Sequence, residues 1–265
     1  ANRIEAGLRG TGTIQGQTVR VRSQDTSRFD ADAGGVAVSA GIGAGGSIAA
    51  NDLSGSVRTT LGGVSVQSTG STLQLSANSD RDATALAVGF SAAGLVAGTG
   101  TATANRSAVT TEVLFSDAAT ITAPGALTVT ALDASRLRAD SASASAALGV
   151  AAGAGLALNE GSDTVRVRAA TGATLAAPSG PILLDARADQ DVDALALGGG
   201  LAGLAAVVGA AAQNTMGTTV QALVNDGAQV TGGSAFTLRA RDDSDLDADA
   251  GGITYAELLD AGLYY

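Results

Sequence analysis

The strongest constraint on this chain is a pattern that returns about every 54 residues. Five segments align in rows of that length: TIQGQTVRVRS at 13–23, SVQSTGSTLQLSA at 65–77, TITAPGALTVTA at 120–131, TLAAPSGPILLDA at 174–186 and QVTGGSAFTLRA at 229–240. Their last residues are separated by 54, 54, 55 and 54 positions. Such a constant period is typical of a solenoid, in which each repeat stacks on the previous one. We place the repeats at 1–52, 53–106, 107–160, 161–215 and 216–252 of a single solenoid.

Within each row, residues of two kinds alternate. Residues 19–23 read VRVRS, residues 73–77 read LQLSA, and the Gly-rich segment 148–158 reads LGVAAGAGLAL. Alternation with period two predicts β-strands with one buried face. We therefore predict an all-β fold, a right-handed parallel β-helix, in which coils lie about 4.8 Å apart and equivalent residues stack in columns.

Each row has a half rich in Val, Leu and Ile and a half of Ala and Gly. We interpret the halves as two coils of about 27 residues, with three coils of about 18 residues as the alternative. Two coils per row give nine or ten coils and a length of roughly 45 Å. Equivalent residues of successive rows then lie in alternate coils and do not touch.

Four rows end in an asparagine, and these asparagines are separated by 54, 54 and 55 positions. At a turn, stacked asparagines can donate from one side-chain amide to the next side-chain carbonyl and can also satisfy backbone groups. We predict such a structural column at a turn for Asn51, Asn105, Asn159 and Asn214.

Composition excludes several classes of function. The net charge is −10, whereas a surface that binds nucleic acid is basic, so we expect no nucleic-acid partner. The chain has no Cys and no His, which removes disulfides, thiolate chemistry and the commonest general base. Residues 194–225 carry no charge, but their Gly and Ala content favours solenoid strands over a membrane span.

One short motif suggests a nucleotide site. Gly41, Gly43 and Gly46 have the G-x-G-x-x-G spacing of a dinucleotide-binding turn. That turn needs a following helix and an acidic residue about 20 positions on, where this chain reads LGGVSVQSTG. We therefore expect no nucleotide cofactor.

Two acidic strings, DQDVD at 189–193 and DDSDLDAD at 242–249, allow two interpretations. Carboxylates in a row can bind calcium. Alternatively, they belong to a solvated face, because the aligned rows place Arg28, Arg136 and Arg138 in the same columns. The candidate calcium ligands are Asp189, Asp191, Asp193, Asp243, Asp245, Asp247 and Asp249.

The last residues, 253–265, read ITYAELLDAGLYY and depart from the repeat. Their apolar spacing is compatible with a short helix. We predict either an end cap formed by Tyr255, Leu258, Leu259 and Tyr264, or a tail.

Residues 172–214 read GATLAAPSGPILLDARADQDVDALALGGGLAGLAAVVGAAAQN. This phrase resembles the repeats of very large secreted bacterial adhesins of the filamentous haemagglutinin or two-partner-secretion type, the leukotoxin-like filamentous adhesins among them. In those repeats a half of the form tvtAgg-l-v-A alternates with a half of the form a-A-a-g--a-gvgaa-A-N. The resemblance implies a β-helix shaft that is secreted or displayed on the bacterial surface. It also implies contact with host or bacterial cell surfaces through other regions of the protein.

We therefore expect a non-catalytic shaft or spacer of an adhesin or extracellular filament. A carbohydrate-active β-helix enzyme is the first alternative, and it requires clustered carboxylates in a groove framed by long loops. The rows differ in length by about one residue, which leaves no room for such loops. A filament subunit that associates end to end with other copies is the second alternative.

Overall fold

The computed structural model describes residues 2–257 and 259–264, and these residues form strands and short connections with no helix. The strands pair in parallel, each with the equivalent strands of the neighbouring repeats. The prediction of an all-β fold with stacked parallel strands is confirmed.

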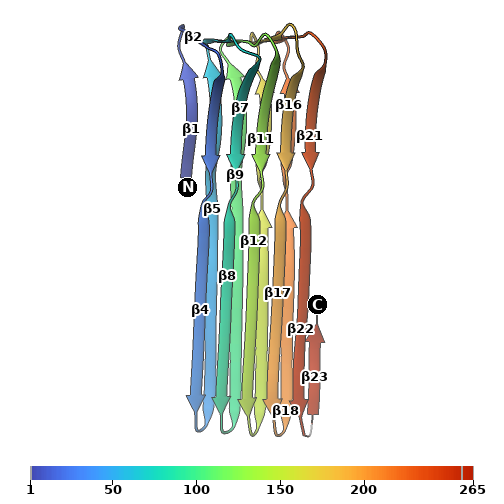
Figure 1. Ribbon diagram of the computed structural model, residues 1–265. Helices are drawn as coiled ribbons and strands as arrows, with labels where there is room; N and C mark the ends of the chain where they lie inside the picture. Colours follow the sequence, from blue (N-terminus) through green and yellow to red (C-terminus); the bar gives the residue numbers. More distant parts are fainter. Residues whose placement is uncertain (1, 258, 265) are drawn as a thin grey trace.

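The strands form four sheets, which we name by their place in the molecule (Figure 1). The roof sheet contains β2 (Thr13–Gly16), β6 (Ser65–Ser68), β10 (Thr120–Thr122), β15 (Thr174–Ala177) and β20 (Gln229–Gly232). The head sheet contains β3 (Val19–Asp25), β7 (Thr72–Ser79), β11 (Ala126–Asp133), β16 (Ile182–Ala188) and β21 (Phe236–Asp242). The blade sheet contains β4 (Arg28–Ser39), β8 (Asp82–Ala93), β12 (Arg136–Ala147), β17 (Asp191–Ala202) and β22 (Asp245–Ala256). The long sheet contains β1 (Asn2–Arg9), β5 (Ile42–Gly62), β9 (Val96–Ser116), β13 (Val150–Gly161), β14 (Thr164–Ala169), β18 (Ala205–Met216), β19 (Thr219–Val224) and β23 (Leu259–Tyr264).

Each repeat forms a single coil. One full coil, for example, runs through β6, β7, β8 and β9, with one strand in each sheet. Residues paired on neighbouring strands belong to successive repeats, as with Arg28 and Asp82, and no other strand lies between them. The prediction of two coils per repeat is therefore wrong. The stack measures roughly 20 Å along its axis instead of roughly 45 Å, because the roof, head and blade sheets each contain five strands that lie about 4.8 Å apart.

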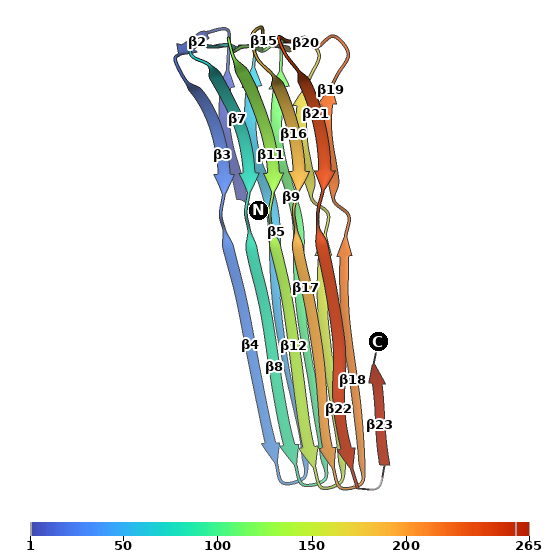
Figure 2. The same ribbon diagram turned by 45° about the vertical axis from the view of Figure 1, so that its right-hand side comes forward.

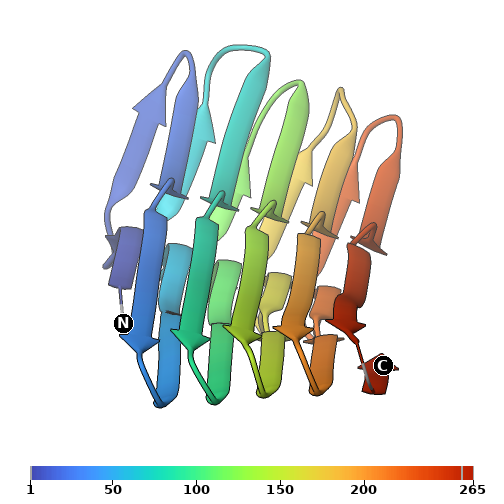
Figure 3. The ribbon, with the colours of Figure 1, turned by 90° about the horizontal axis from the view of Figure 1, so that it is seen from below.

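Every coil has a wide part and a narrow part (Figure 2). The head is enclosed by the roof sheet, the head sheet and one part of the long sheet. In the first coil, residues 53–62 form that part. The blade consists of the blade sheet and the other part of the long sheet. In the first coil, residues 42–51 form that part. A two-residue turn, 40–41 in the first coil, joins the two sheets at the tip, and a short elbow, 26–27 in the first coil, joins head to blade. Seen from the tip, the coils lie side by side in chain order (Figure 3).

The head holds the large apolar side chains. Alternating residues of its three sheets point inward and form one continuous buried cluster. Its columns contain, among others, Leu73, Leu127 and Ile182 of the head sheet and Val66, Ile121 and Leu175 of the roof sheet, all fully buried.

The interior of the blade is lined mainly by small side chains. Its buried clusters contain alanines such as Ala139, Ala157 and Ala196, whereas the larger buried residues Leu137 and Val192 lie at its elbow end. A Cβ atom added to Gly153 in the long sheet would lie 2.5 Å from the carbonyl oxygen of Gly199 in the blade sheet. Sheets that carry ordinary side chains pack about 10 Å apart, so the blade is thin because these positions lack side chains. The two halves of each row are thus the two parts of one coil.

The C-terminal segment continues the solenoid. β22 runs through Ala256 in register with β17, and β23 pairs in parallel with β18. The expected short helix is therefore wrong. Ile253 and Tyr255 keep the outward positions of the strand alternation, and this period overrides the helical spacing. Leu258 lies outside the described residues, and Leu259 and Tyr264 belong to β23.

The close approach of the blade sheet and the long sheet within the blade yields a prediction. Gly153→Ala places a methyl group against opposing backbone and should lower the free energy of unfolding by about 1–3 kcal/mol. Urea unfolding monitored by circular dichroism measures the change. Gly98→Ala is the matched control, because nothing lies within 4 Å of a Cβ at that position and the variant should be neutral or slightly stabilised. Equal stability of the two variants would contradict a close-packed blade.

Candidate functional site

The predicted asparagines form a direct hydrogen-bonded ladder. Nδ2 of Asn51 donates to Oδ1 of Asn105 at 3.0 Å, Asn105 donates likewise to Asn159 at 3.0 Å, and Asn159 to Asn214 at 2.9 Å. Direct contact is available because equivalent residues lie in adjacent coils. The ladder thus connects four successive coils.

The ladder also connects the two sheets of the blade. Nδ2 of Asn105 donates to the backbone carbonyl of Arg138 at 2.7 Å, and Nδ2 of Asn51 donates to that of Thr84 at 2.8 Å. Both acceptors belong to the blade sheet, whereas the asparagines lie within β5 and β9 of the long sheet. The expected position at a turn is therefore wrong: the column lies inside strands, near the elbow.

A second buried polar group occupies the elbow. Oδ2 of Asp25 and Nη2 of Arg81 form an ion pair at 2.8 Å with almost no exposure. In the next coils, Nε2 of Gln190 donates to Asp133 at 2.8 Å and to Asp163 at 2.7 Å. One amide thus bridges two buried carboxyl groups from different sides of the elbow.

Each carboxyl group of this bridge has further donors. The hydroxyl of Ser135 donates to Asp133 at 2.5 Å. Asp163 accepts from the hydroxyl of Ser107 at 2.8 Å and from the backbone N–H of Val109 at 2.7 Å. Burial raises the pKa of Asp133 to about 6, and the neighbouring charge of Asp163 adds to the rise. The hydrogen bonds and the charge of Arg81 act in the opposite direction.

Two close carboxyl groups, one with a raised pKa, can act as acid and base in glycoside hydrolysis. Here Asp133 is 0% exposed and Asp163 is 1% exposed, so no substrate reaches them in this structure. Their hydrogen bonds connect the head sheet to the long sheet. The arrangement therefore acts as a structural bridge at the elbow.

Sequence reasoning missed this bridge, although a signal was present. Asp133 follows Leu127, Val129 and Ala131 at steps of two, so its side chain points into the coil with theirs. An aspartate at an inward position of a strand needs a buried partner. The alternation alone therefore marks Asp133 as a paired interior residue.

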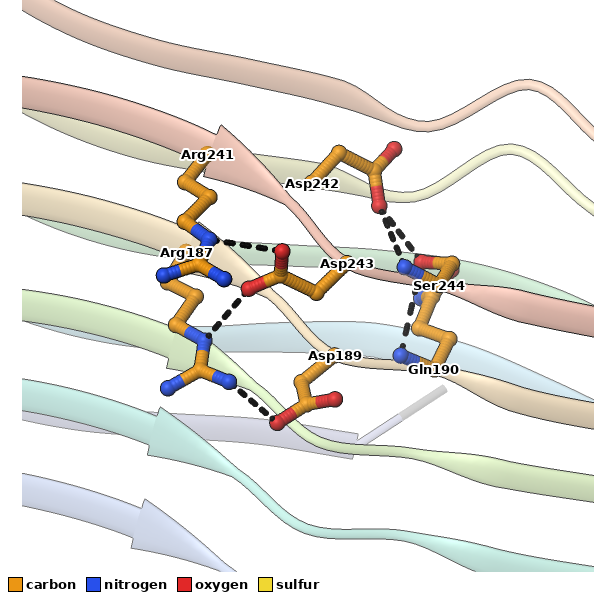
Figure 4. A network of polar contacts seen from close by, with 7 residues as sticks. All are labelled: Arg187, Asp189, Gln190, Arg241, Asp242, Asp243 and Ser244. Carbon is orange, nitrogen blue, oxygen red and sulfur yellow. Dashed lines mark hydrogen bonds and ion pairs between the residues drawn. The ribbon is translucent and has the colours of Figure 1, made fainter.

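The seven aspartates considered as calcium ligands lie on the outside of the elbow and blade. Asp243 binds Nε of Arg241 at 2.6 Å and Nε of Arg187 at 3.2 Å, and Asp189 binds Nη2 of Arg187 at 2.8 Å (Figure 4). Asp191 lies 3.9 Å from Nε of Arg136. Among the described residues, no group of three or more potential ligands is placed to hold a metal ion. These contacts agree with the solvated, arginine-paired face.

The remaining aspartates continue along the outer face of β17 and β22. Asp193, Asp247 and Asp249 lie beside Arg138 and Asp140 around a shallow depression. Partial burial raises the pKa of Asp193 above its ordinary value, and the charge of Asp191 adds to this. Asp245 pairs in register with Asp191, so carboxylates stack directly on each other at this end of the column.

A groove with several carboxylates does exist at the elbow. It is lined by Asp80, Asp189, Asp191, Asp243 and Asp245 around Arg136 and Gln190. None of these lining residues is aromatic, so none of them offers a ring on which a sugar could stack. The connections beside it are short, since only residues 189–190 separate β16 from β17.

The glycine motif is part of the tip. Gly41 lies in the turn between β4 and β5, whereas Gly43 and Gly46 lie within β5. A strand follows the motif, so the helix that a dinucleotide-binding turn requires does not form here.

Within the described part of the chain, no helix has the length and apolar character needed to cross a membrane.

No protein-family model matches this chain, and neither a curated protein nor a solved structure shows significant similarity to it.

The asparagine ladder yields a prediction. Asn105→Ala leaves Asn51, Asn159 and the carbonyl of Arg138 each without one hydrogen-bond partner in the interior. The free energy of unfolding should fall by about 2–4 kcal/mol, measured by urea denaturation. Gln213→Ala, next to the ladder but exposed, should change it by less than about 0.5 kcal/mol. A loss in Asn105→Ala no larger than in the control would contradict a stabilising ladder.

The buried carboxyl bridge yields a prediction about pH. Folded Asp133 keeps its proton up to about pH 6, whereas the unfolded chain loses it near 3.8, so the folded state binds more protons between these values. The free energy of unfolding should therefore fall by on the order of 3 kcal/mol as pH rises through this window. Asp133→Asn should remove this part of the pH dependence, measured by thermal unfolding at pH 4–7. The exposed-site control Asp191→Asn should keep it, and an unchanged profile in Asp133→Asn would contradict the assignment.

Proposed function

We propose that this chain is a non-catalytic shaft or spacer segment, built as a right-handed β-solenoid, of a secreted bacterial surface adhesin or extracellular filament. The observation that carries the proposal is the uninterrupted register of the coils. The roof, head and blade sheets each contain one strand from every coil, and the long sheet continues from β1 to β23. Such a stack has a direction along which it is extended simply by adding repeats.

The polar chemistry of the interior supports a mechanical role. The asparagine ladder and the Gln190 bridge connect coils and sheets to one another. Buried hydrogen-bond networks of this kind rigidify a structure when every member has a partner. Short turns between long strands leave little backbone that can move independently.

The second candidate is a carbohydrate-active β-solenoid, favoured by the carboxylate-lined groove at the elbow. Three of its aspartates are engaged by Arg136, Arg187 and Arg241. Without aromatic side chains or long loops, the groove has few means to hold a sugar chain against them. We therefore place the shaft first; release of reducing sugar from polysaccharides by the purified chain would favour the enzyme.

The shaft proposal predicts a location outside the cell. Antibodies raised against the purified chain should label intact, unpermeabilised cells of its native source, with immunogold particles on or beyond the outer surface in electron micrographs. An antibody against a cytoplasmic protein of the same cells serves as the control and should label only after permeabilisation. Labelling by the anti-chain antibody that also requires permeabilisation would overturn the proposal.

A further inference from the structure

The part of the blade next to the tip is apolar on both of its outer faces. In the first four coils it comprises equivalent segments, which we call the apolar end of the blade: residues 34–49, 88–103, 142–157 and 197–212. These segments contain no Arg, Asp or Glu. Val36 on the blade sheet and Ile48 on the long sheet are 76% and 77% exposed, and Leu148 at the tip is 80% exposed. Exposed apolar surface therefore surrounds the end of the blade on three sides.

The polar side chains of the apolar end face inward. Those that are buried are Ser47, Ser91, Thr99, Thr101, Thr103, Ser141, Ser143 and Ser145. Oγ1 of Thr99 donates to Oγ of Ser91 at 2.7 Å, and Oγ1 of Thr101 lies 2.7 Å from Oγ of Ser141. A sheet that faces water carries apolar residues inward and polar residues outward, whereas strands that contact lipid carry them in the reverse order. The apolar end of the blade has the order that suits a hydrocarbon solvent.

The backbone of the interior coils also meets the requirement of such a solvent. In lipid, each backbone N–H and C=O needs a partner within the protein. In the blade sheet, β8 and β12 have a paired strand on both sides, and in the long sheet β9 and β13 do so as well. The second and third coils therefore satisfy this requirement, however many coils the stack contains.

The shape of the apolar surface favours lipid over a protein partner. A typical protein interface covers one patch on each partner. Covering both faces of the blade and its tip requires a partner with a cleft that matches all three surfaces. The tips of successive coils lie in a row (Figure 3), so such a cleft would have to follow the whole stack. Fluid hydrocarbon chains cover the same surface without a matching shape.

We propose that the apolar end of the blade inserts into one leaflet of a phospholipid bilayer, with acyl chains against both of its faces. From Gly34 to Ser39 at the tip, six residues of about 3.3 Å each give a depth of roughly 20 Å. A bilayer with its headgroups is about 40–45 Å thick, so the blade reaches the depth of one leaflet and does not cross. The proposal adds a lipid partner and is independent of the proposed shaft function.

Charged columns lie where the apolar end begins and ends, at the level of the headgroups. On the blade sheet, Asp32 and Asp140 share a column. On the long sheet, Asp52, Arg106 and Glu160 share another, in which Nε of Arg106 binds Glu160 at 3.2 Å. Most of these groups are acidic and the net charge of the chain is −10, so anionic headgroups repel it. We therefore expect tighter binding to phosphatidylcholine than to phosphatidylglycerol vesicles.

The ends of the stack oppose insertion. In the blade sheet β4 has one neighbour among the described strands, and the fifth coil carries Glu257 directly after β22, at its tip. A free strand edge and a carboxylate are both costly in hydrocarbon. The interior coils therefore supply the favourable part of the binding, and probes of insertion belong in those coils.

Flotation with phosphatidylcholine vesicles tests the insertion. The chain should float with the vesicles, and added salt should not release it because the contact is apolar. Leu148→Asp places a charge in the hydrocarbon and should lower the partition coefficient by about 100-fold. Leu223→Asp, at an exposed leucine of the head, should leave it unchanged, and circular dichroism verifies that both variants are folded. A chain that stays in the buffer, or equal losses in the two variants, would overturn the proposal.

Fluorescent labels test the depth, since the chain has no cysteine of its own. Labels on Ala146→Cys in the blade sheet and on Ala152→Cys in the long sheet should both be quenched by nitroxides on the acyl chains. A label on Ser179→Cys, exposed at the far end of the head, should not be quenched. Quenching on only one face would indicate flat adsorption and would contradict insertion. So would a lipid-free oligomer, detected by light scattering, that Leu148→Asp dissociates, because it would assign the tips to other copies of the chain.

Discussion

The close approach of two backbones within the blade is the constraint on which the rest of the structure depends. Where Gly153 faces Gly199, there is no room for even one carbon atom between the sheets. Small residues therefore occupy most inward positions of the blade, and most of the large aliphatic side chains that stabilise the coil are buried in the head. Burial of those side chains contributes about 25 cal/mol for each Å² of apolar surface. The blade gains less from burial and relies more on backbone pairing between coils, on the hydroxyl contacts of Thr99 with Ser91 and Thr101 with Ser141, and on the asparagine ladder.

The sequence contained the period, the strand alternation and the residues of the ladder, and all three were predictable because each is a regular pattern. The number of coils was not predictable in the same way. A row with an apolar half and an Ala-Gly half describes two narrow coils as well as one coil with a wide head and a thin blade. The pairing of equivalent residues on adjacent strands, such as Arg28 with Asp82, distinguishes them. The helix prediction for the C-terminal segment failed for a related reason. ITYAELL fits a helix locally, but Ile253 and Tyr255 also fit the outward positions of a strand, and pairing with β17 decides between them.

The candidate site was harder to predict than the fold, because its residues come together only through stacking. Asp133 ends strand β11, whereas Asp163 and Gln190 lie in two different connections. The three residues belong to two successive coils, and nothing in their local sequence relates one to another. The exposed aspartates are close to one another in sequence, yet several of them are paired with arginines on the surface. In a solenoid, column position therefore says more about chemistry than distance along the chain does. Carboxyl groups at inward positions become structural bridges, and those at outward positions join charge networks.

Near the tip of the blade, several bulky apolar residues occupy outward columns. In most folds the large side chains point inward and the small or polar ones outward, whereas near the tip of this blade the order is inverted. Val36, Val38 and Ile253 contribute little to the folding of a single chain, since each is more than 70% exposed. Their apolar surface stabilises nothing until another surface removes it from water. A thin blade cannot bury these side chains in its own interior, because its two sheets leave no space. The inversion therefore follows from the packing constraint inside the coil: the narrower the blade, the more of its apolar surface is left facing outward.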